Sequence, residues 1–136
     1  MGAGIGTEEY RRHFLKDKVE KFSKELKLLS SWTITDPHEC FCCFTKSLMA
    51  KWRYLMRTMG CFSDVFSPLD EIIEKSFFPS LFGRDIDPVE RTLFSLPCRL
   101  GGLGIPVIRE LAKNEYEASQ RITFALKSRI LNQTLV

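Results

Sequence analysis

Apolar residues in the first quarter of the chain follow a helical repeat. Between residues 7 and 31 they recur at alternating spacings of four and three, which places them on one face of a helix: Leu15, Val19, Phe22, Leu26 and Leu29. Thr7 is suited to cap this helix, and Glu8 and Glu9 occupy its first turn, where the helix dipole favours acids. The pattern predicts a helix from Thr7 to about Ser31 with a lysine-rich, solvated outer face.

Three later helices are predicted from a shared start signal. At Asp36-Pro37, Ser67-Pro68 and Asp87-Pro88 an oxygen-bearing capping residue precedes a proline, which is tolerated at the first helical position. The first of these helices runs to Gly60, and the second is kinked or ended by Pro79. The third is a helix of about two turns, closed by Pro97.

The sequence of the last part of the chain predicts a glycine-rich loop at residues 97–106, followed by a final helix from about Ile108 to Leu131. One face of this helix carries Leu111, Ala118, Ile122, Leu126 and Ile130. No run of alternating residues indicates a strand. We therefore expect an all-α fold of about five helices in a small bundle, as a single domain over residues 1–136.

Composition fits such a domain and narrows its class only slightly. The chain has 136 residues, 44% hydrophobic and 27% charged, with a net charge of +3. These values are typical of globular proteins and argue against a disordered chain. Five cysteines, two of them adjacent, do not match a secreted disulfide scaffold. With no apolar run long enough to span a membrane and no signal-peptide pattern, we expect a soluble intracellular protein.

Local charge is more informative than the total. Between Cys40 and Ser63 lie four bases, Lys46, Lys51, Arg53 and Arg57, and no acid. Lys46, Arg53 and Arg57 are seven and four residues apart, so an α-helix would align them in one stripe. Such a stripe suits contact with a phosphate backbone, and it also occurs as ordinary solvated surface.

Catalytic and metal chemistry finds little support. His38, Cys40 and Cys43 carry zinc-binding groups, but a second ligand pair is missing, so small buried cysteines are the simpler interpretation. The glycine loop lacks the Gly-Lys-Ser/Thr ending of a phosphate-binding loop, and its glycines more simply supply positive φ or close backbone approach. Asp70 and Glu74 are expected on an acidic helix face, which needs no functional explanation. No catalytic residue, metal or cofactor is predicted.

The glycine loop also carries a resemblance. LPCRLGGLGI (residues 96–105) resembles the Leu-Pro-x-Arg-Leu-Gly-Gly-Leu-Gly-Ile segment downstream of the polymerase palm in reverse transcriptase-like retroelement proteins of the non-LTR (LINE-like) kind. KWRYLMRT (51–58) is similar to that family's Lys/Arg-Trp-x-Tyr-x-x-Arg-Thr helix, and GIGTEEY (4–10) to the stretch that leads out of the palm. Further similar segments follow in order: KDKV (16–19), PLDE (68–71), FPSLFGR (78–84) and EYEAS (115–119).

The resemblance implies the thumb and connecting helices that follow a palm. The family's Tyr-x-Asp-Asp turn, whose carboxylates hold two magnesium ions, has no counterpart here, since the chain has no Asp-Asp pair. A non-catalytic fragment is therefore implied, which would hold an RNA–DNA or DNA template–primer duplex in the parent polymerase without sequence preference. Lys46, Arg53, Arg57 and Arg99 are the implied nucleic-acid contacts.

Two departures from the family pattern affect local structure. Cysteines stand at 40, 42 and 43, where relatives carry alanine, which favours core packing over zinc binding. Pro106-Val107-Ile108 replaces the family's x-Asn-Pro, so the last helix loses its usual cap and we expect its start to be frayed or shifted.

Other interpretations remain open. One is a helical module for protein interaction or self-association with no nucleic-acid role. Another is a decayed copy of a mobile element with no selected function. An independent enzyme is the least supported, because no catalytic site can be assembled.

Overall fold

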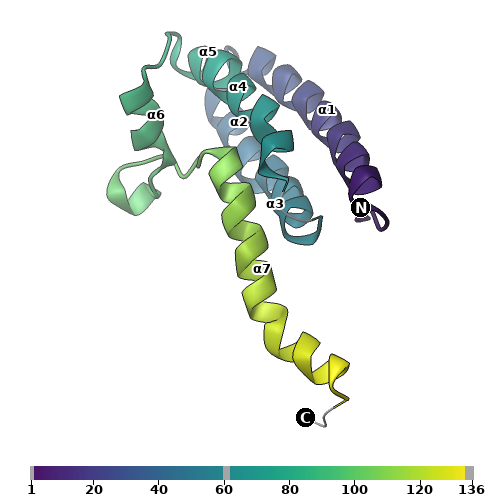
Figure 1. Ribbon diagram of the computed structural model, residues 1–136. Helices are drawn as coiled ribbons and strands as arrows, with labels where there is room; N and C mark the ends of the chain where they lie inside the picture. Colours follow the sequence, from purple (N-terminus) through teal and green to yellow (C-terminus); the bar gives the residue numbers. More distant parts are fainter. Residues whose placement is uncertain (1, 60–61, 134–136) are drawn as a thin grey trace.

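The structure, a computed structural model, describes residues 2–59 and 62–133, and five helices account for most of them (Figure 1). The first is α1 (Glu8–Trp32). The second is continuous through α2 (Pro37–Cys43), η1 (Phe44–Leu48) and α3 (Met49–Thr58). The third is continuous through α4 (Ser67–Ile72), η3 (Ile73–Phe77) and α5 (Phe78–Phe82). The remaining two are α6 (Pro88–Ser95) and α7 (Ile108–Leu131), and η2 (Ser63–Phe66) and η4 (Cys98–Leu100) are short 3₁₀ turns. No strand occurs among the described residues, which confirms the all-α prediction.

The start and the buried face of α1 are those predicted. The Thr7 hydroxyl accepts a hydrogen bond from the Tyr10 amide, which satisfies one of the free N–H groups of the first turn. All five residues of the predicted apolar face are buried, namely Leu15, Val19, Phe22, Leu26 and Leu29. The amphipathic repeat was therefore sufficient to define how α1 packs.

Of the three residues predicted to cap a helix before a proline, Asp36 and Asp87 occupy the cap position, and only Asp87 makes the capping hydrogen bond. Asp87 does cap α6, since its carboxylate accepts from the Glu90 amide at 2.9 Å. Asp36 makes no capping hydrogen bond, and the turn that holds it is closed by its own amide, which donates to the Trp32 carbonyl. Ser67 already has helical backbone angles because η2 leads directly into α4, so its side chain is not at a cap position.

The second and third helices each contain a π-helical turn that the sequence pattern did not predict. These turns, η1 and η3, interrupt otherwise α-helical backbone. Their aromatic residues meet in the core, where the Phe44 and Phe77 rings stack with centroids 4.8 Å apart. The third helix also continues through Pro79 and ends at Gly83, whose φ of 70° is left-handed. The second helix ends at Thr58; its predicted end, Gly60, lies outside the described residues.

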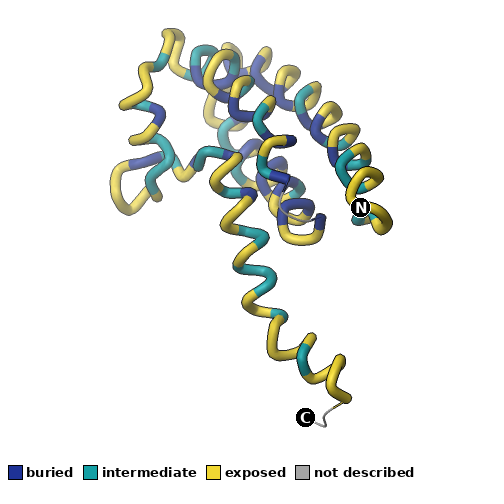
Figure 2. Tube along the Cα trace, viewed as in Figure 1, coloured by how far each residue is buried: buried dark blue, intermediate teal, exposed yellow. Residues whose placement is uncertain are grey.

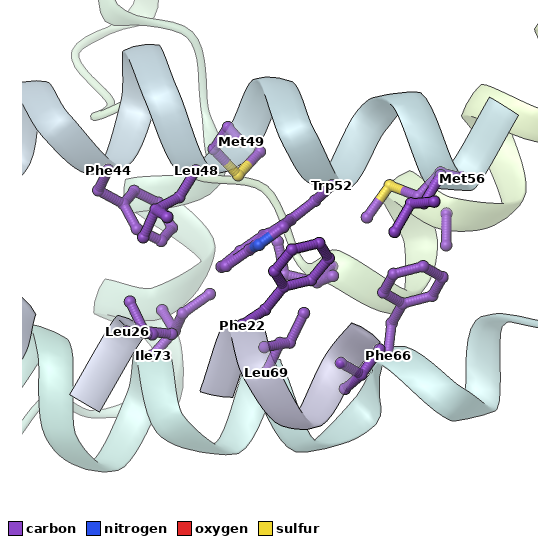
Figure 3. Packing of buried hydrophobic residues seen from close by; sticks show 14 of the residues in the cluster. Phe22, Leu26, Phe44, Leu48, Met49, Trp52, Met56, Phe66, Leu69 and Ile73 are labelled. Carbon is purple, nitrogen blue, oxygen red and sulfur yellow. The ribbon is translucent and has the colours of Figure 1, made fainter. Parts of the chain in front are cut away.

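The core is built around Trp52. Its fully buried indole lies between α1 and the third helix, in edge contact with the Phe44 ring at 5.4 Å and tilted against the Phe22 ring at 6.1 Å (Figure 3). Leu69 and Ile73 close the core from the third helix, and both are fully buried. This packing fixes the outer faces of α1 and of the second and third helices, because each of these three has one side in the same core.

The last helix is only half packed. Ile108 and Ala112 near its start are buried, and this half of α7 lies against α3. Its second half extends away from the other helices and ends at Leu131 (Figures 1 and 2). Ile122, Leu126 and Ile130 therefore lie on a regular apolar face that no described residue covers, with 71%, 58% and 66% of each residue exposed.

Candidate nucleic-acid interface

Lys46, Arg53 and Arg57 are all exposed on the second helix, opposite its buried residues. Trp52 and Leu55 of the same helix are fully buried in the core and so anchor the helix that carries the basic residues. Lys46 lies within the π-helical turn η1, and a π-helical turn holds more residues than an α-helical turn. In a regular α-helix, the spacing of seven residues would align Lys46 with Arg53. The π-helical turn rotates Lys46 about the helix axis, away from that alignment.

Ion pairing divides these bases into two groups. Arg57 Nε lies 2.9 Å from Glu115 Oε2 of α7, and Lys51 Nζ lies 3.6 Å from Glu25 Oε2 of α1. Lys46 and Arg53 form no ion pair with any residue that the structure describes. The first pair connects α3 to α7 and partly neutralises Arg57, whereas Lys46 and Arg53 present uncompensated positive charge.

Arg99 lies apart from the other three predicted contacts. It belongs to η4, which is on the α6 side of the molecule, away from α3 (Figure 1). The loop around it follows α6 closely: the Gly104 amide donates to the Leu96 carbonyl at 2.9 Å, and a Cβ on Gly102 would lie 2.0 Å from that same oxygen. Gly101 and Gly104 have φ of 84° and 68°. Positive φ and close backbone approach, the two roles predicted for these glycines, are thus both present.

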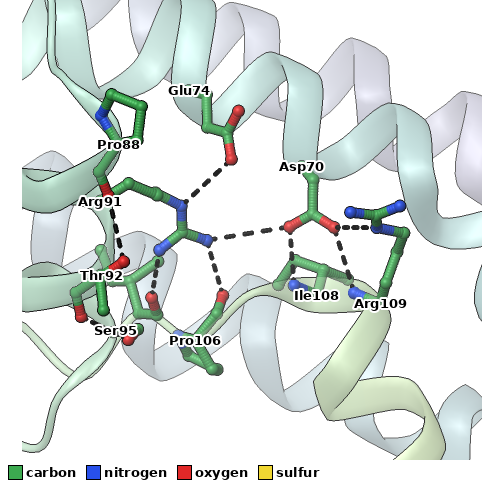
Figure 4. Close-up of polar contacts among 10 residues, drawn as sticks. Asp70, Glu74, Pro88, Arg91, Thr92, Ser95, Pro106, Ile108 and Arg109 are labelled. Carbon is green, nitrogen blue, oxygen red and sulfur yellow. Dashed lines mark hydrogen bonds and ion pairs between the residues drawn. The ribbon is translucent and has the colours of Figure 1, made fainter.

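The most elaborate polar arrangement was not predicted from the sequence. Asp70 of α4 is buried, and its carboxylate accepts hydrogen bonds from the amides of Ile108 and Arg109 at 2.7 and 3.1 Å (Figure 4). Asp70 therefore caps α7 from another helix. This contact replaces the cap that the sequence lacks, and the expected fraying or shift of the start of α7 is not observed. The sequence pattern had placed Asp70 on an acidic helix face and did not predict that its side chain is buried.

A buried arginine completes this cluster. The Arg91 guanidinium donates to the carbonyls of Ile105 and Pro106 at 2.7 and 2.9 Å and lies 3.8 Å from Asp70 Oδ1 (Figure 4). It also stacks over the Phe78 ring at 5.3 Å. Arg91 thereby joins α6, the glycine loop and the third helix, so we interpret the cluster as an internal structural link.

Burial affects both charged groups of the link. It raises the pKa of Asp70 above its ordinary value, although hydrogen bonds from the two capping amides and the charge of Arg91 act in the opposite direction. Burial also lowers the pKa of Arg91. Both shifts have a structural cause. Arg91 also lines a groove of about 170 Å³ beside Glu74.

The histidine and cysteine cluster of α2 does not form a metal centre. Cys40 is buried, and burial raises the pKa of its thiol. Cys43 is exposed, and Cys42 Sγ lies 3.8 Å from His38 Nε2 on the outer surface. Among the described residues, no three histidine, cysteine or acidic side chains are arranged to hold a metal ion.

Comparison with protein-family models, with curated proteins and with solved structures found no match. Within the described parts of the chain, no helix combines the length and apolar character that crossing a membrane requires. The resemblance to retroelement reverse transcriptases therefore stays a prediction from the sequence motifs.

Proposed function

We propose that this chain is a non-catalytic, thumb-like module of a reverse transcriptase-type polymerase that contacts the backbone of a nucleic-acid duplex through Lys46, Arg53 and Arg57. The observation that carries the proposal is the exposed, unpaired charge of Lys46 and Arg53 on a helix whose other side is fixed in the core. No acid lies within residues 40–63 to repel phosphates. Phosphate contacts of this kind are independent of base sequence.

The three bases differ in how readily they would reach a phosphate. Lys46 and Arg53 would need only to shed water, whereas Arg57 would have to leave Glu115 or share it. Arg99 would reach the same duplex only if the duplex also extended along the α6 side of the molecule. The core contact of the proposed interface is thus Lys46 with Arg53.

Salt dependence tests this proposal directly. Binding of fluorescent DNA–DNA and RNA–DNA duplexes is followed by anisotropy over a series of salt concentrations. Each phosphate contact contributes about 0.9 to the slope of log affinity against log salt. Replacing Lys46 and Arg53 together by alanine is expected to reduce the slope by about two.

A matched double variant is available on α1. Lys21 and Lys27 are exposed bases that form no ion pair with a described residue, so Lys21→Ala/Lys27→Ala removes the same charge from another face. It should leave the slope almost unchanged. A wild-type slope near zero, or equal losses in the two double variants, would exclude an interface at Lys46 and Arg53.

The second candidate function is a helical module for protein interaction or self-association. The observation in its favour is the uncovered apolar face of α7, formed by Ile122, Leu126 and Ile130. In its simplest form this function predicts concentration-dependent oligomers by light scattering and no response to nucleic acid.

A further inference from the structure

The second half of α7 combines apolar and basic residues and carries no acid. Glu117 is the last acid in the sequence, and Arg121, Lys127 and Arg129 follow it. Ile122, Leu126 and Ile130 recur every four residues, so they form a continuous apolar row along one side of the helix. We call residues 118–131 the α7 tip. A surface that is apolar in the middle and acidic at the rim would complement this segment.

The same chain presents a surface of that description at its other end. A groove of about 440 Å³ opens between the end of α1 and the start of α2. Leu29, Trp32 and Cys40 supply its apolar lining, and 60% of Trp32 is exposed. Asp36 and Glu39 stand on its rim. We call this the α1–α2 groove.

The two rim acids are free to receive cations. Both are exposed, and neither forms an ion pair with another residue that the structure describes. Asp36 is also released from helix capping, since its side chain makes no capping hydrogen bond. The groove thus holds two uncompensated carboxylates beside an exposed indole, which matches a helix with basic residues flanking an apolar row.

One molecule cannot bring these two surfaces together. The end of α1 and the α7 tip lie at opposite ends of the molecule (Figure 1). Pairing of two α7 tips is disfavoured because each carries only positive charges, and like charges across an interface are repulsive. The groove of a second copy supplies the opposite charge and an apolar lining.

We propose that the α7 tip of one copy binds in the α1–α2 groove of the next, so that the chain associates head to tail. The contact is heterologous, because each molecule contributes a different surface to each of its two neighbours. Such contacts produce open chains of copies unless a ring closes. This assembly uses surfaces other than the basic face of α3, so it goes beyond the proposed nucleic-acid contact.

The first test is sedimentation velocity of the full chain, freed of nucleic acid, over a wide range of protein concentrations. The mean sedimentation coefficient is expected to rise continuously, without a plateau at the dimer. Ile122→Glu/Leu126→Glu should abolish this rise. The residues are exposed in the monomer, so the variant should keep the wild-type circular dichroism spectrum.

Matched controls separate the proposed surfaces from general stickiness. Phe124 is as exposed as Ile122 but projects from the other side of α7, so Phe124→Glu should assemble like the wild type. For the groove, Asp36→Lys/Glu39→Lys should abolish assembly. Glu8→Lys/Glu9→Lys reverses two exposed acids in the first turn of α1, at the other end of that helix from the groove, and should not abolish assembly.

Mixing the two defective variants gives the decisive result. The tip variant keeps an intact groove and the groove variant keeps an intact tip, so an equimolar mixture should form one-to-one dimers and nothing larger. A mixture that stays monomeric, or a tip variant that still self-associates, would overturn the proposal. So would a monomeric wild type whose tip instead binds vesicles containing phosphatidylserine or a nucleic-acid duplex.

Discussion

The carboxylate of Asp70 caps the last helix from a position 38 residues earlier in the sequence, where Oδ1 accepts a hydrogen bond from the Ile108 amide at 2.7 Å. The start of a helix has free N–H groups and a partial positive charge. A carboxylate there accepts hydrogen bonds from these groups and interacts favourably with the charge. In this chain the acid is supplied by another helix, because Val107 at the cap position has no side-chain oxygen. The direction in which α7 leaves the body thus depends on a contact with α4.

The stability of this link is expected to depend on Arg91 far more than on Arg109. Both guanidinium groups lie within 4 Å of Asp70, at 3.8 and 3.7 Å, but the Arg91 side chain is 8% exposed and that of Arg109 is 61% exposed. Arg91→Met leaves a buried carboxylate without its buried partner and two carbonyls without their donor. Such losses cost about 3–5 kcal/mol, whereas an exposed ion pair contributes about 1 kcal/mol or less.

The unfolding free energies of Arg91→Met and Arg109→Met, measured by urea unfolding, test this difference. Arg91→Lys should recover little, because a lysine ammonium cannot reproduce the guanidinium fork that reaches Ile105 and Pro106. Equal losses of unfolding free energy for Arg91→Met and Arg109→Met would show that burial does not set the strength of this link.

Acid titration should reveal the burial of Asp70. Its pKa is raised in the folded protein, chiefly by burial, from an ordinary value of 3.8. Between 3.8 and the folded pKa the folded state therefore binds more protons than the unfolded state. The contribution of Asp70 to the unfolding free energy is largest below 3.8 and falls as pH rises through the folded pKa.

Asp70→Asn removes this titration and serves as the reference. The unfolding free energy of the wild type minus that of Asp70→Asn should decrease as pH rises from below 3.8 to neutrality. If the difference increases instead, the capping amides and Arg91 outweigh burial, and the folded pKa is depressed.

Helices and their buried faces could be predicted from the sequence where the signals lie within a single helix. For α1 the repeat of three and four identified every buried aliphatic position, and Thr7 and Asp87 cap as local rules predict. The caps at Asp36 and Ser67 failed because the preceding backbone, a turn closed on Trp32 in one case and η2 in the other, controls those positions.

The candidate site was predictable in part. Lys46, Arg53 and Arg57 are exposed, as predicted, although the π-helical turn rotates Lys46 out of line with the other two. The partner of Arg57, Glu115, lies 58 residues away and no local pattern indicates it. The π-helical turn at Lys46 was missed because it coincides with a contact between two helices, the Phe44–Phe77 stack, and a repeat along one helix carries no information about such a contact.

Gly102 is expected to tolerate substitution less well than its neighbour Gly101. A Cβ at Gly101 meets no atom within 4 Å but would sit on backbone with φ of 84°, a conformation that costs an L-residue about 1–2 kcal/mol. A Cβ at Gly102 would lie 2.0 Å from the Leu96 carbonyl oxygen, so the loop must move. Gly102→Ala should lose more unfolding free energy than Gly101→Ala in thermal or urea unfolding; the reverse order would mean that the loop shifts freely.

Neutralising Glu115 should strengthen duplex binding if Arg57 belongs to the nucleic-acid interface. The Glu115 carboxylate holds Arg57 Nε at 2.9 Å and would compete with a phosphate for the same guanidinium. Glu115→Gln removes this competition, so the slope of log affinity against log salt should steepen by about one. Glu110→Gln is the control, because it removes one charge from the same helix. Glu110 is exposed and forms no ion pair with a described residue, so this variant should alter affinity without a comparable change in slope. If Glu115→Gln and Glu110→Gln behave alike, Arg57 acts only as a bridge between α3 and α7, and phosphate contact is left to Lys46 and Arg53.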